Sequence, residues 1–515
     1  MSTPPFPETI PALLEWRAAS CGARPWLFTT GDALSLNEVL AIVDRYATGL
    51  LERGVGRGDR VALILGNQPE ALFTWFAANR LGAAAMPLQP SLKRREVAGI
   101  LHTTRPRVVV TEAREAALDL ATLAVNDLNG GPPPHVTTPQ ALAAAGSGSP
   151  RAAVHPDDVA VLLATSGTTG EPKAVQQTHR TYTLTAESFP AWVGLGVEDR
   201  LLAALPLFHI NAQAYSVMGA LGAGASLALL PKFSASTFWA DAARLGATEF
   251  NSVGAMIRIL ANTPAGSHDR AHGVRLCYAA LALPEAEHRA FEARFGLSMT
   301  VGYGLSETTF GTVWPRDARP YGTMGALRQH PRLGVINHAR VVRDDGTDAP
   351  GDEAGELLLR NPAMMRGYVG RAGETEAAFT GPWFRTGDLV RRDAAGNYTF
   401  VARKKEVLRR RGENVAAAEI EAVLASHPAV SEAAAVGVPS ALGEDDIVAF
   451  VLLRAGAAVS TAELRDWAQA RLADFKVPSE IHLVDELPRT PTARVAKHVL
   501  RARLEALRPS IKAGR

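Results

Sequence analysis

The stretch Thr165–Lys173, TSGTTGEPK, gathers residue types that can hold a phosphate group. It contains four hydroxyl residues, two glycines, a proline and a lysine in nine positions. Glycines let a backbone approach a bulky anion, and N–H groups and hydroxyls can then donate hydrogen bonds to phosphate oxygens. Lys173 adds a positive charge at the rim. The spacing differs from that of a Walker A loop, and an ordinary Gly/Thr-rich turn is the alternative interpretation.

The elements around this loop predict a wound α/β sheet. The apolar run Val159–Ala164 precedes the loop and indicates a buried strand. Strands and helices alternate along the first 300 residues, which favours parallel pairing. Predicted strands are Arg60–Leu65, Ala83–Leu88, Arg107–Thr111, Leu201–Leu207, Ala225–Leu230, Thr248–Val253, Val274–Ala280 and Ser298–Gly302. Predicted helices are Ile10–Ala19, Leu36–Arg53, Pro69–Leu81 and Ser91–Thr103. Residues 127–157 are rich in Gly, Pro and Ser and suggest a loose surface connection.

The pattern changes after about residue 325. Gly355–Arg360 and Asn397–Ala402 predict a small β-rich subdomain. A compact α+β unit then follows from about residue 406. We therefore expect a large N-terminal domain, residues 1–404, and a small C-terminal domain, residues 405–515, with the boundary near Lys405.

Composition restricts the class of protein. The 515 residues are 47% hydrophobic and 21% charged, as in an ordinary globular chain. Since 54 basic residues balance 52 acidic ones, we expect neither a nucleic-acid nor a membrane partner. The two cysteines, Cys21 and Cys277, suit neither a disulfide framework nor a metal site, and a reducing, cytoplasmic location is expected.

The loop and further motifs, in the same order, resemble those of the adenylate-forming superfamily, which includes acyl-CoA synthetases, nonribosomal peptide adenylation domains and beetle luciferase. The resemblance covers essentially the whole chain. The further motifs are Tyr303–Thr308 (YGLSET), Trp383–Asp388 (WFRTGD), Arg403–Lys405 with Gly412–Asn414 and Glu419–Glu421, and Leu487–Thr492 (LPRTPT). A weaker similarity over Glu249–Leu260 points to the short-acid, carnitine-type CoA ligases.

The resemblance implies a two-step reaction and the residues that carry it. A carboxylate attacks the α-phosphorus of ATP to give acyl-AMP and pyrophosphate, and a thiol then releases AMP. Glu307 would bind Mg²⁺, which takes one or two carboxylates together with phosphate oxygens. Ser306 would touch the α-phosphate. The β- and γ-phosphates would be held by Thr165, Ser166, Gly167, Thr168, Thr169, Gly170 and Lys173.

The resemblance also assigns the nucleoside and acyl ends. Asp388 would accept hydrogen bonds from the ribose diol, and Arg403 would contact the ribose. Tyr303 would stack on the adenine, and its alternative is a core tyrosine. Gly304 would belong to the same nucleotide-binding motif. His209 would stand between the acyl pocket and the thiol tunnel, and its alternative is a structural histidine. Position alone suggests the acyl-pocket residues Asn251, Ser252, Gly254, Met256, Leu305 and Thr309.

Two C-terminal features bear on the order of the steps. Lys405 resembles the hinge about which the C-terminal domain turns between half-reactions, so that Gly412 would face the CoA tunnel. The family carries a catalytic lysine in a Thr-Gly-Lys context, where this chain reads Thr492-Ala493-Arg494. Arginine keeps the charge but is planar and wider, so that Arg494 is the departure that matters most.

Three hypotheses follow. The first is a complete ATP-dependent acyl-CoA ligase, with ATP, Mg²⁺ and coenzyme A, in which Arg494 does the lysine's work. The second is a half-enzyme that forms the thioester from acyl-AMP made by a separate adenylating enzyme. The third is a catalytically silent protein that binds an acyl or nucleotide ligand. A carrier-protein thiol in place of CoA also stays open. The acid is predicted to be a small or medium organic or aryl acid.

Overall fold

The structure is a computed structural model, and its described part divides into two compact units. It describes residues 5–128, 132–165, 173–280, 282–404, 407–410, 413–439, 445–490 and 495–507 of the 515. The first unit comprises Met1–Ala339, Leu358–Arg385 and Ala395–Tyr398. The second comprises Arg340–Leu357, Thr386–Ala394 and Thr399–Arg515.

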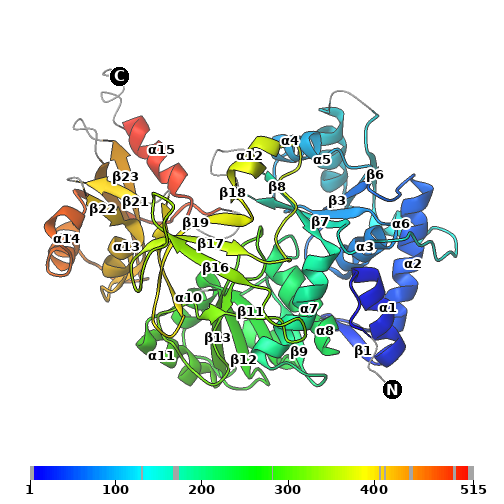
Figure 1. The fold of residues 1–515 in the computed structure, drawn as a ribbon, viewed down its shortest axis with the longest axis horizontal. Helices are drawn as coiled ribbons and strands as arrows, with labels where there is room; N and C mark the ends of the chain where they lie inside the picture. The colour runs from blue at the N-terminus through cyan, green and yellow to red at the C-terminus, as the bar shows by residue number, and fades with distance from the viewer. Residues whose placement is uncertain are drawn as a thin grey trace. The chain divides into compact units, whose positions relative to one another are not determined.

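Two mostly parallel sheets form the frame of the first unit (Figure 1). One has the strand order β15-β14-β13-β12-β11-β9-β10-β1-β2, and the other has the order β6-β5-β3-β4-β7-β8. The strands are β1 (Pro25–Phe28), β2 (Ala33–Ser35), β3 (Arg60–Ile64), β4 (Ala84–Pro87), β5 (Val108–Thr111), β6 (His135–Thr137), β7 (Val159–Thr165), β8 (Lys173–Thr178), β9 (Arg200–Ala203), β10 (Ser226–Leu229), β11 (Glu249–Val253), β12 (Leu276–Ala280), β13 (Ser298–Tyr303), β14 (Thr312–Val313) and β15 (Ala326–Leu327).

Helices cover both faces of these sheets, as parallel strands buried on both sides require. They are α1 (Ile10–Cys21), α2 (Leu36–Glu52), α3 (Pro69–Arg80), α4 (Arg94–Thr104), α5 (Glu115–Asn126), α6 (Pro139–Ala143), α7 (His179–Val193), α8 (Met218–Ala223), α9 (Phe238–Arg244), α10 (Gly254–Asn262), α11 (Glu285–Phe295) and α12 (Ala372–Ala377). Helix α2 begins at a capping box, in which Ser35 and Glu38 each satisfy the other's backbone N–H.

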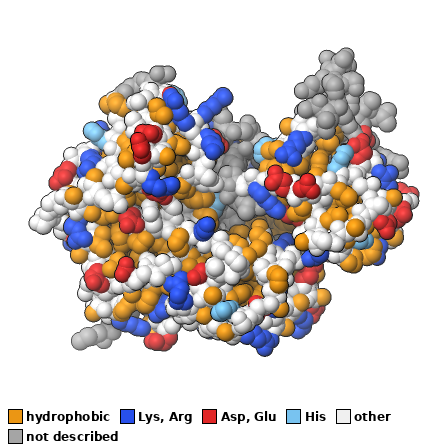
Figure 2. Space-filling model, turned by 180° about the vertical axis from the view of Figure 1, so that it is seen from behind, with side chains coloured by type: hydrophobic (Ala, Val, Ile, Leu, Met, Phe, Trp, Pro, Cys, Tyr) orange, Lys and Arg blue, Asp and Glu red, His pale blue; other side chains and the backbone are white. Residues whose placement is uncertain are grey.

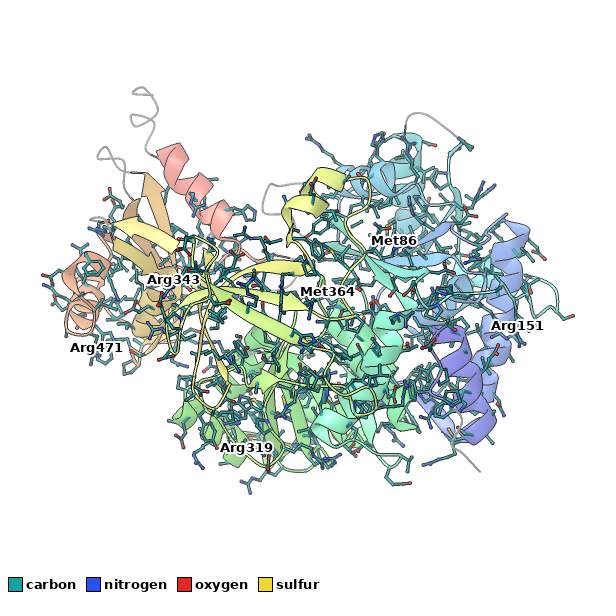
Figure 3. All side chains as sticks on the ribbon, in the orientation of Figure 1. Met86, Arg151, Arg319, Arg343, Met364 and Arg471 are labelled. Atoms are coloured by element: carbon teal, nitrogen blue, oxygen red, sulfur yellow. The ribbon has the colours of Figure 1, made fainter. Side chains whose placement is uncertain are left out.

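Two hydrophobic clusters hold the layers of the first unit together. The smaller joins α4 and α5 to one face of the β3–β4–β5 sheet, and it includes Met86, a residue labelled in Figure 3. The larger joins α1, α2 and α3 to the strands of both sheets. Helix α7 belongs to this larger core and is buried on nearly all sides, from His179 to Val193. Strands β8 and β9, which precede and follow α7 in the chain, are therefore both connected to a buried helix.

A third sheet is formed by strands between His338 and Arg403. It has the order β16-β17-β19-β18, with β20 paired to β19. Its strands are β16 (His338–Val342), β17 (Gly355–Arg360), β18 (Phe379–Thr380), β19 (Trp383–Arg392) and β20 (Tyr398–Arg403). Strands β16, β17, β19 and β20 each begin in one unit and end in the other.

The rest of the second unit is an α+β fold around the sheet β23-β24-β25. Helices α13 and α14 pack on one face of this sheet and α15 packs on the other. The elements are β21 (Val407–Arg410), β22 (Glu413–Ala416), α13 (Ala417–Ala425), β23 (Val430–Pro439), β24 (Asp445–Leu453), α14 (Thr461–Gln469), a 3₁₀ turn (Asp474–Lys476), β25 (Glu480–Val484) and α15 (Lys497–Leu507).

The predicted fold class is confirmed, with two local differences. Residues 127–157 were expected to be a loose connection, yet they contain β6 and α6. Val136 of β6 pairs with Val109 at the sheet edge, and Leu142 of α6 packs closely on Gly49 of α2. Pairing is also not parallel throughout, because β7 and β8 form an antiparallel hairpin.

Figure 2 shows basic and acidic side chains interspersed with apolar ones over one face of the molecule. Among the helices of the described residues, none combines the length and the apolar character needed to cross a membrane.

His179 gives the first unit a pH-dependent stability. Its ring is fully buried at the start of α7, where its Nδ1 accepts a hydrogen bond from the Ile10 N–H. Burial lowers the pKa of His179 from 6.5 to about 4, against an opposing effect of Asp158. Between these two pH values the unfolded chain binds a proton that the folded chain excludes. Stability should therefore fall as pH decreases through this window, by roughly 3 kcal/mol in total.

Unfolding midpoints measured from pH 7 to pH 4.5 test this effect. Asn at position 179 keeps an acceptor near the Nδ1 position but does not titrate in this range. We expect the His179→Asn midpoint to fall less steeply than that of the wild type. Parallel profiles of the two proteins would contradict the assignment.

Candidate active site

The predicted phosphate loop joins the two strands of a hairpin. Strands β7 and β8 pair so that Thr165 and Lys173 lie directly opposite each other. The Thr165 hydroxyl donates a 3.3 Å hydrogen bond to the Lys173 carbonyl. Residues 166–172, which include the predicted Ser166, Gly167, Thr168, Thr169 and Gly170, lie outside the described residues. The structure thus fixes both ends of the loop.

Lys173 lies in a polar environment that belongs to a later part of the chain. Its Nζ is 2.5 Å from Glu374 Oε2 and 4.8 Å from the centre of the Tyr368 ring. Arg371 makes a second ion pair with Glu374, at 2.7 Å. The hydrogen bond from Lys173 is the main reason why the pKa of Glu374 is lowered. The lysine predicted to bind phosphate is therefore held by α12 and by the tyrosine that precedes this helix.

Glu307 is anchored through both its backbone and its carboxylate. Its carbonyl accepts a 2.7 Å hydrogen bond from the Met365 N–H, and its Oε1 accepts one of 3.1 Å from the Tyr368 hydroxyl. The carbonyl of the preceding Ser306 accepts a hydrogen bond from the Gln177 side chain. Tyr368 therefore contacts both Lys173 and Glu307, which are 134 positions apart in the sequence.

Thr309 gives the loop after Tyr303 an unusual backbone. Its φ is +51°, in the left-handed region that residues other than glycine rarely adopt. The Tyr215 hydroxyl donates a 2.5 Å hydrogen bond to the Thr309 carbonyl. Gly304 is required here, because a Cβ at this position would lie 2.7 Å from the Thr309 oxygen and 3.2 Å from the Tyr215 hydroxyl. The loop of residues 303–309, which contains Glu307, is therefore tightly packed on itself and on Tyr215.

Tyr215 belongs to a π-helix, η1 (Asn211–Val217), which begins just after His209. π-Helical segments are rare in proteins, and those that occur often lie at functional sites. The His209 carbonyl accepts a hydrogen bond from the Gln213 N–H, and its ring lies 4.5 Å from that of Phe208. Asn67 holds the preceding residues by hydrogen bonds to Leu205 and Leu207.

The suggested acyl-pocket residues lie around this π-helix and β11. Asn251 is buried and its side chain is 2.7 Å from the Ser216 hydroxyl of η1. Ser252 follows in the same strand, so the two side chains point to opposite faces of the sheet. Met256 is buried in the core of the first unit. These contacts place Asn251, but not Ser252, on the side of β11 that faces η1.

Asp388 and Arg403 come together within the second unit. Arg403 Nε is 2.6 Å from Asp388 Oδ1, and the Asp388 side chain is fully buried. The Asp388 N–H donates to the Thr386 hydroxyl, which donates to the Leu357 carbonyl. The turn at Gly387 has φ +69°, which favours glycine. The fixed carboxylate and guanidinium form a pair suited to a diol.

The C-terminal motifs are described only in part. Lys405, Gly412 and Arg494 lie outside the described residues, so the hinge, tunnel and catalytic roles of these residues stay predictions. Arg489 and Val495, on either side of residues 491–494, form an antiparallel bridge. Lys476 and Lys497 pair with Glu419 and Glu421 of α13, at 2.8 and 2.7 Å. These two lysines thus have structural partners within the second unit.

Sequence analysis missed Tyr368, Glu374 and Tyr215. Tyr368 and Glu374 lie in a segment that no motif singled out, and their partners are far away in the sequence. A π-helix has no hydrophobic period that distinguishes it from an α-helix, so the position of Tyr215 could not be predicted. The glycine before Tyr368 is the local feature that could have drawn attention to this segment, and in the structure Gly367 has a φ of +137°.

Glu307 is a carboxylate that could bind a metal ion together with phosphate oxygens of a nucleotide. Among the described residues, no group of three or more His, Cys, Asp or Glu side chains could hold a metal ion by itself. Mg²⁺ bound to nucleotides typically takes only one or two protein carboxylates. Glu307, which is held in a fixed orientation beside the β7–β8 hairpin, meets this requirement.

Family models account for both parts of the chain. A model described as AMP-binding enzyme matches residues 14–369. The chain belongs to this family. A second model, AMP-binding enzyme C-terminal domain, matches residues 419–494. The chain is thus a member of the adenylate-forming superfamily and an enzyme of the acyl-CoA ligase type, as its curated relatives also indicate.

Two of these relatives span nearly the whole chain. Sulfoacetate–CoA ligase of Cupriavidus necator is 35% identical over 507 residues, which are 95% of this chain and 97% of that protein. Crotonobetaine/carnitine–CoA ligase of Salmonella typhimurium is 33% identical over 488 residues, 91% and 92% of the two chains.

Solved structures agree with the fold. ATP-bound MatB from Rhodopseudomonas palustris has a TM-score of 0.87 at 27% identity and covers 96% of this chain and 99% of its own. The anthranilate CoA ligase AuaEII, in complex with anthranoyl-AMP, has a TM-score of 0.89 at 26% identity, with 98% and 99% covered. Both are structures of proteins that hold a nucleotide or an acyl-adenylate.

Proposed function

We propose that this member of the AMP-binding enzyme family activates a carboxylic acid with ATP, through an acyl-AMP, and transfers the acyl group to CoA. The observation that carries the proposal is the joint placement of Lys173 and Glu307 by Tyr368. One is a cation for phosphate oxygens, and the other is a hard ligand for a metal. An anionic carboxylate can attack an anionic phosphate only if such groups offset the charge.

Each group has a defined task in the two steps. Lys173 binds the β- and γ-phosphates, and Asp388 with Arg403 binds the ribose. The acid's oxygen attacks the α-phosphorus in line with the departing pyrophosphate, and the CoA thiolate then attacks the acyl carbon and displaces AMP. Mg²⁺, held with ATP by Glu307, would supply additional positive charge on the phosphates.

We propose a small polar acid as the substrate. The proposal rests on the relatives, whose names refer to sulfoacetate and to crotonobetaine or carnitine. It also rests on Asn251 and the η1 residue Ser216, which bring polar groups to one side of β11. If Asn251 lines the acyl pocket, as its position in the sequence suggests, its amide group would suit a polar acid better than a purely aliphatic one.

The thioester-forming half-enzyme remains a second candidate because of Ala493-Arg494. If arginine cannot replace the family's lysine, the adenylation step fails and acyl-AMP must come from another enzyme. The silent binding protein is less well supported, because Thr165, Lys173, Glu307, Asp388 and Arg403 are all present.

Product analysis with a panel of acids tests the proposal. Purified protein is incubated with ATP, Mg²⁺, CoA and sulfoacetate, carnitine, crotonobetaine, benzoate or anthranilate, and acyl-CoA, AMP and pyrophosphate are measured. We expect the three products in equal amounts with at least one small polar acid. A second assay supplies the matching acyl-AMPs and CoA without ATP. Acyl-CoA formed only in this second assay would favour the half-enzyme. No product in either assay would contradict both the complete ligase and the half-enzyme.

Asp388→Asn should weaken nucleotide binding through the ribose. The substitution keeps the shape of the side chain but removes the charge that strengthens its hydrogen bonds and its pair with Arg403. We expect the KM for ATP and the Kd for AMP to rise about 10- to 150-fold, since hydrogen bonds to charged groups contribute about 1.5–3 kcal/mol. AMP binding isolates the effect, because AMP lacks the β- and γ-phosphates.

Asp344→Asn provides the matched control. Asp344 also pairs with a basic residue of the second unit, Lys404, at 2.8 Å, but its side chain is 85% exposed. We expect this variant to bind AMP within about twofold of the wild type, since exposed pairs contribute little. Equal losses in the two variants would rule out a specific role for Asp388.

A further inference from the structure

Tyr368 lies outside the recognised motifs, yet it contacts two residues on which phosphate chemistry would depend. Its ring centre is 4.8 Å from Lys173 Nζ, and its hydroxyl donates a 3.1 Å hydrogen bond to Glu307 Oε1. The side chain is 9% exposed. An aromatic face attracts an ammonium group, and a phenol is a good donor to a carboxylate. One buried side chain therefore serves both residues in different ways.

The backbone around Tyr368 is held to the same two parts of the site. Residues 366–369 pair with β8, through hydrogen bonds from Arg366 to Gln176, from Gln176 to Gly367 and from Val369 to Ala174. One residue earlier, Met365 donates to the Glu307 carbonyl. The segment that contains Tyr368 is thus hydrogen-bonded both to strand β8 and to the backbone of Glu307.

The tight turn before Tyr368 leaves the side chain little freedom, since a Cβ at Gly367 would lie 2.7 Å from the Thr375 side chain.

We propose that Tyr368 is a positioning residue that couples the phosphate-binding Lys173 to the metal-binding Glu307. The ring holds the Lys173 ammonium group 4.8 Å from its centre, and the hydroxyl holds the Glu307 carboxylate in the orientation in which it would bind the metal. This inference rests on the proposed function. It separates the two tasks by atom: the oxygen of Tyr368 acts on metal binding, and the ring acts on phosphate binding.

ATP binding in the absence of any acid tests the separation. Calorimetric titrations with ATP are carried out in EDTA and at increasing Mg²⁺ concentrations, so that the identity of the acid does not matter. Tyr368→Phe keeps the ring, and we expect its metal-free ATP affinity to stay within about twofold of the wild type. The Mg²⁺ concentration for half-maximal tightening should rise about 10-fold, because Glu307 loses a charge-assisted hydrogen bond.

Two further variants complete the design. Tyr368→Leu loses the ring as well, and its metal-free ATP affinity should fall about three- to fivefold in addition. Tyr46→Phe is the control, because Tyr46 is a buried tyrosine of α2 that packs on Phe73 in the core. It should leave both quantities unchanged. Melting temperatures are measured for all the variants, and the comparison uses those that melt as cooperatively as the wild type.

The outcomes distinguish the inference from the function on which it rests. An unchanged Mg²⁺ response in Tyr368→Phe, or the same shift in Tyr46→Phe, would overturn the positioning role while wild-type ATP binding still supports the ligase. Equal metal-free affinities of the Leu and Phe variants would overturn the role of the ring. A wild-type protein that does not bind ATP with Mg²⁺ would overturn the proposed function, and this inference with it.

Discussion

Replacement of Glu307 by glutamine is expected to reduce acid-dependent pyrophosphate release about 100- to 1,000-fold. Loss of one well-placed electrostatic group at a reacting centre typically costs about 3–4 kcal/mol of transition-state stabilisation. Glutamine keeps the shape of the side chain and can still accept from the Tyr368 hydroxyl, which is 3.1 Å away in the native protein. The Met365 hydrogen bond involves only the Glu307 backbone and is unaffected. The loss would therefore report on charge rather than on folding.

The second half-reaction supplies the internal control for Glu307→Gln. Attack of the thiol on a supplied acyl-AMP involves no β- or γ-phosphate, so the metal ligand should not be needed. We expect the variant to form acyl-CoA from acyl-AMP within about threefold of the wild-type rate. A similar loss in both half-reactions would show that Glu307 holds the site together instead of binding the metal.

Arg494→Ala should also separate the two half-reactions. If Arg494 takes the place of the family's catalytic lysine, its loss removes a cation that offsets charge between the carboxylate and the α-phosphate. We expect pyrophosphate release to fall about 100- to 1,000-fold and thioester formation from acyl-AMP to change less than about threefold. The two nearby lysines should not compensate, because Lys476 and Lys497 pair with Glu419 and Glu421.

Arg494→Lys shows whether arginine is an adequate substitute. A complete ligase should keep pyrophosphate release within about tenfold, since both side chains carry the charge and differ in shape. A wild type that does not adenylate and a lysine variant that does would identify the half-enzyme. Equal pyrophosphate release by wild type and Arg494→Ala would show that residue 494 takes no part in the step.

The sequence predicted the fold class and most elements because their signals are local. The alternation of apolar strands and amphipathic helices predicted the wound sheets, and helix α2, predicted over Leu36–Arg53, is observed over Leu36–Glu52. The segment around β6 and α6 was not predicted, because its Gly/Pro-rich composition hides a short edge strand. Val136 is held there by its pairing with Val109, a contact that no local pattern reveals.

Motif residues were found from the sequence, whereas the residues that orient them were not. Lys173 and Glu307 stand in recognisable loops, and Asp388 and Arg403 form an ion pair, while their proposed binding of a ribose stays a prediction. Tyr368 and Tyr215 donate hydrogen bonds to residues 61 and 94 positions away, and the Tyr368 ring also lies beside Lys173. Such long-range contacts depend on how the layers pack, so that a sequence without a structure gives no reason to select them.

The acyl-adenylate is tested most directly by following an oxygen atom from acid to nucleotide. An acid identified in the product panel is labelled with ¹⁸O in its carboxylate and incubated with the protein, ATP, Mg²⁺ and CoA. Attack of that carboxylate on the α-phosphorus transfers one labelled oxygen to AMP when the thiol displaces it. We expect one ¹⁸O in the AMP and none in the pyrophosphate. Unlabelled AMP, or label in a released phosphate, would contradict the proposed reaction.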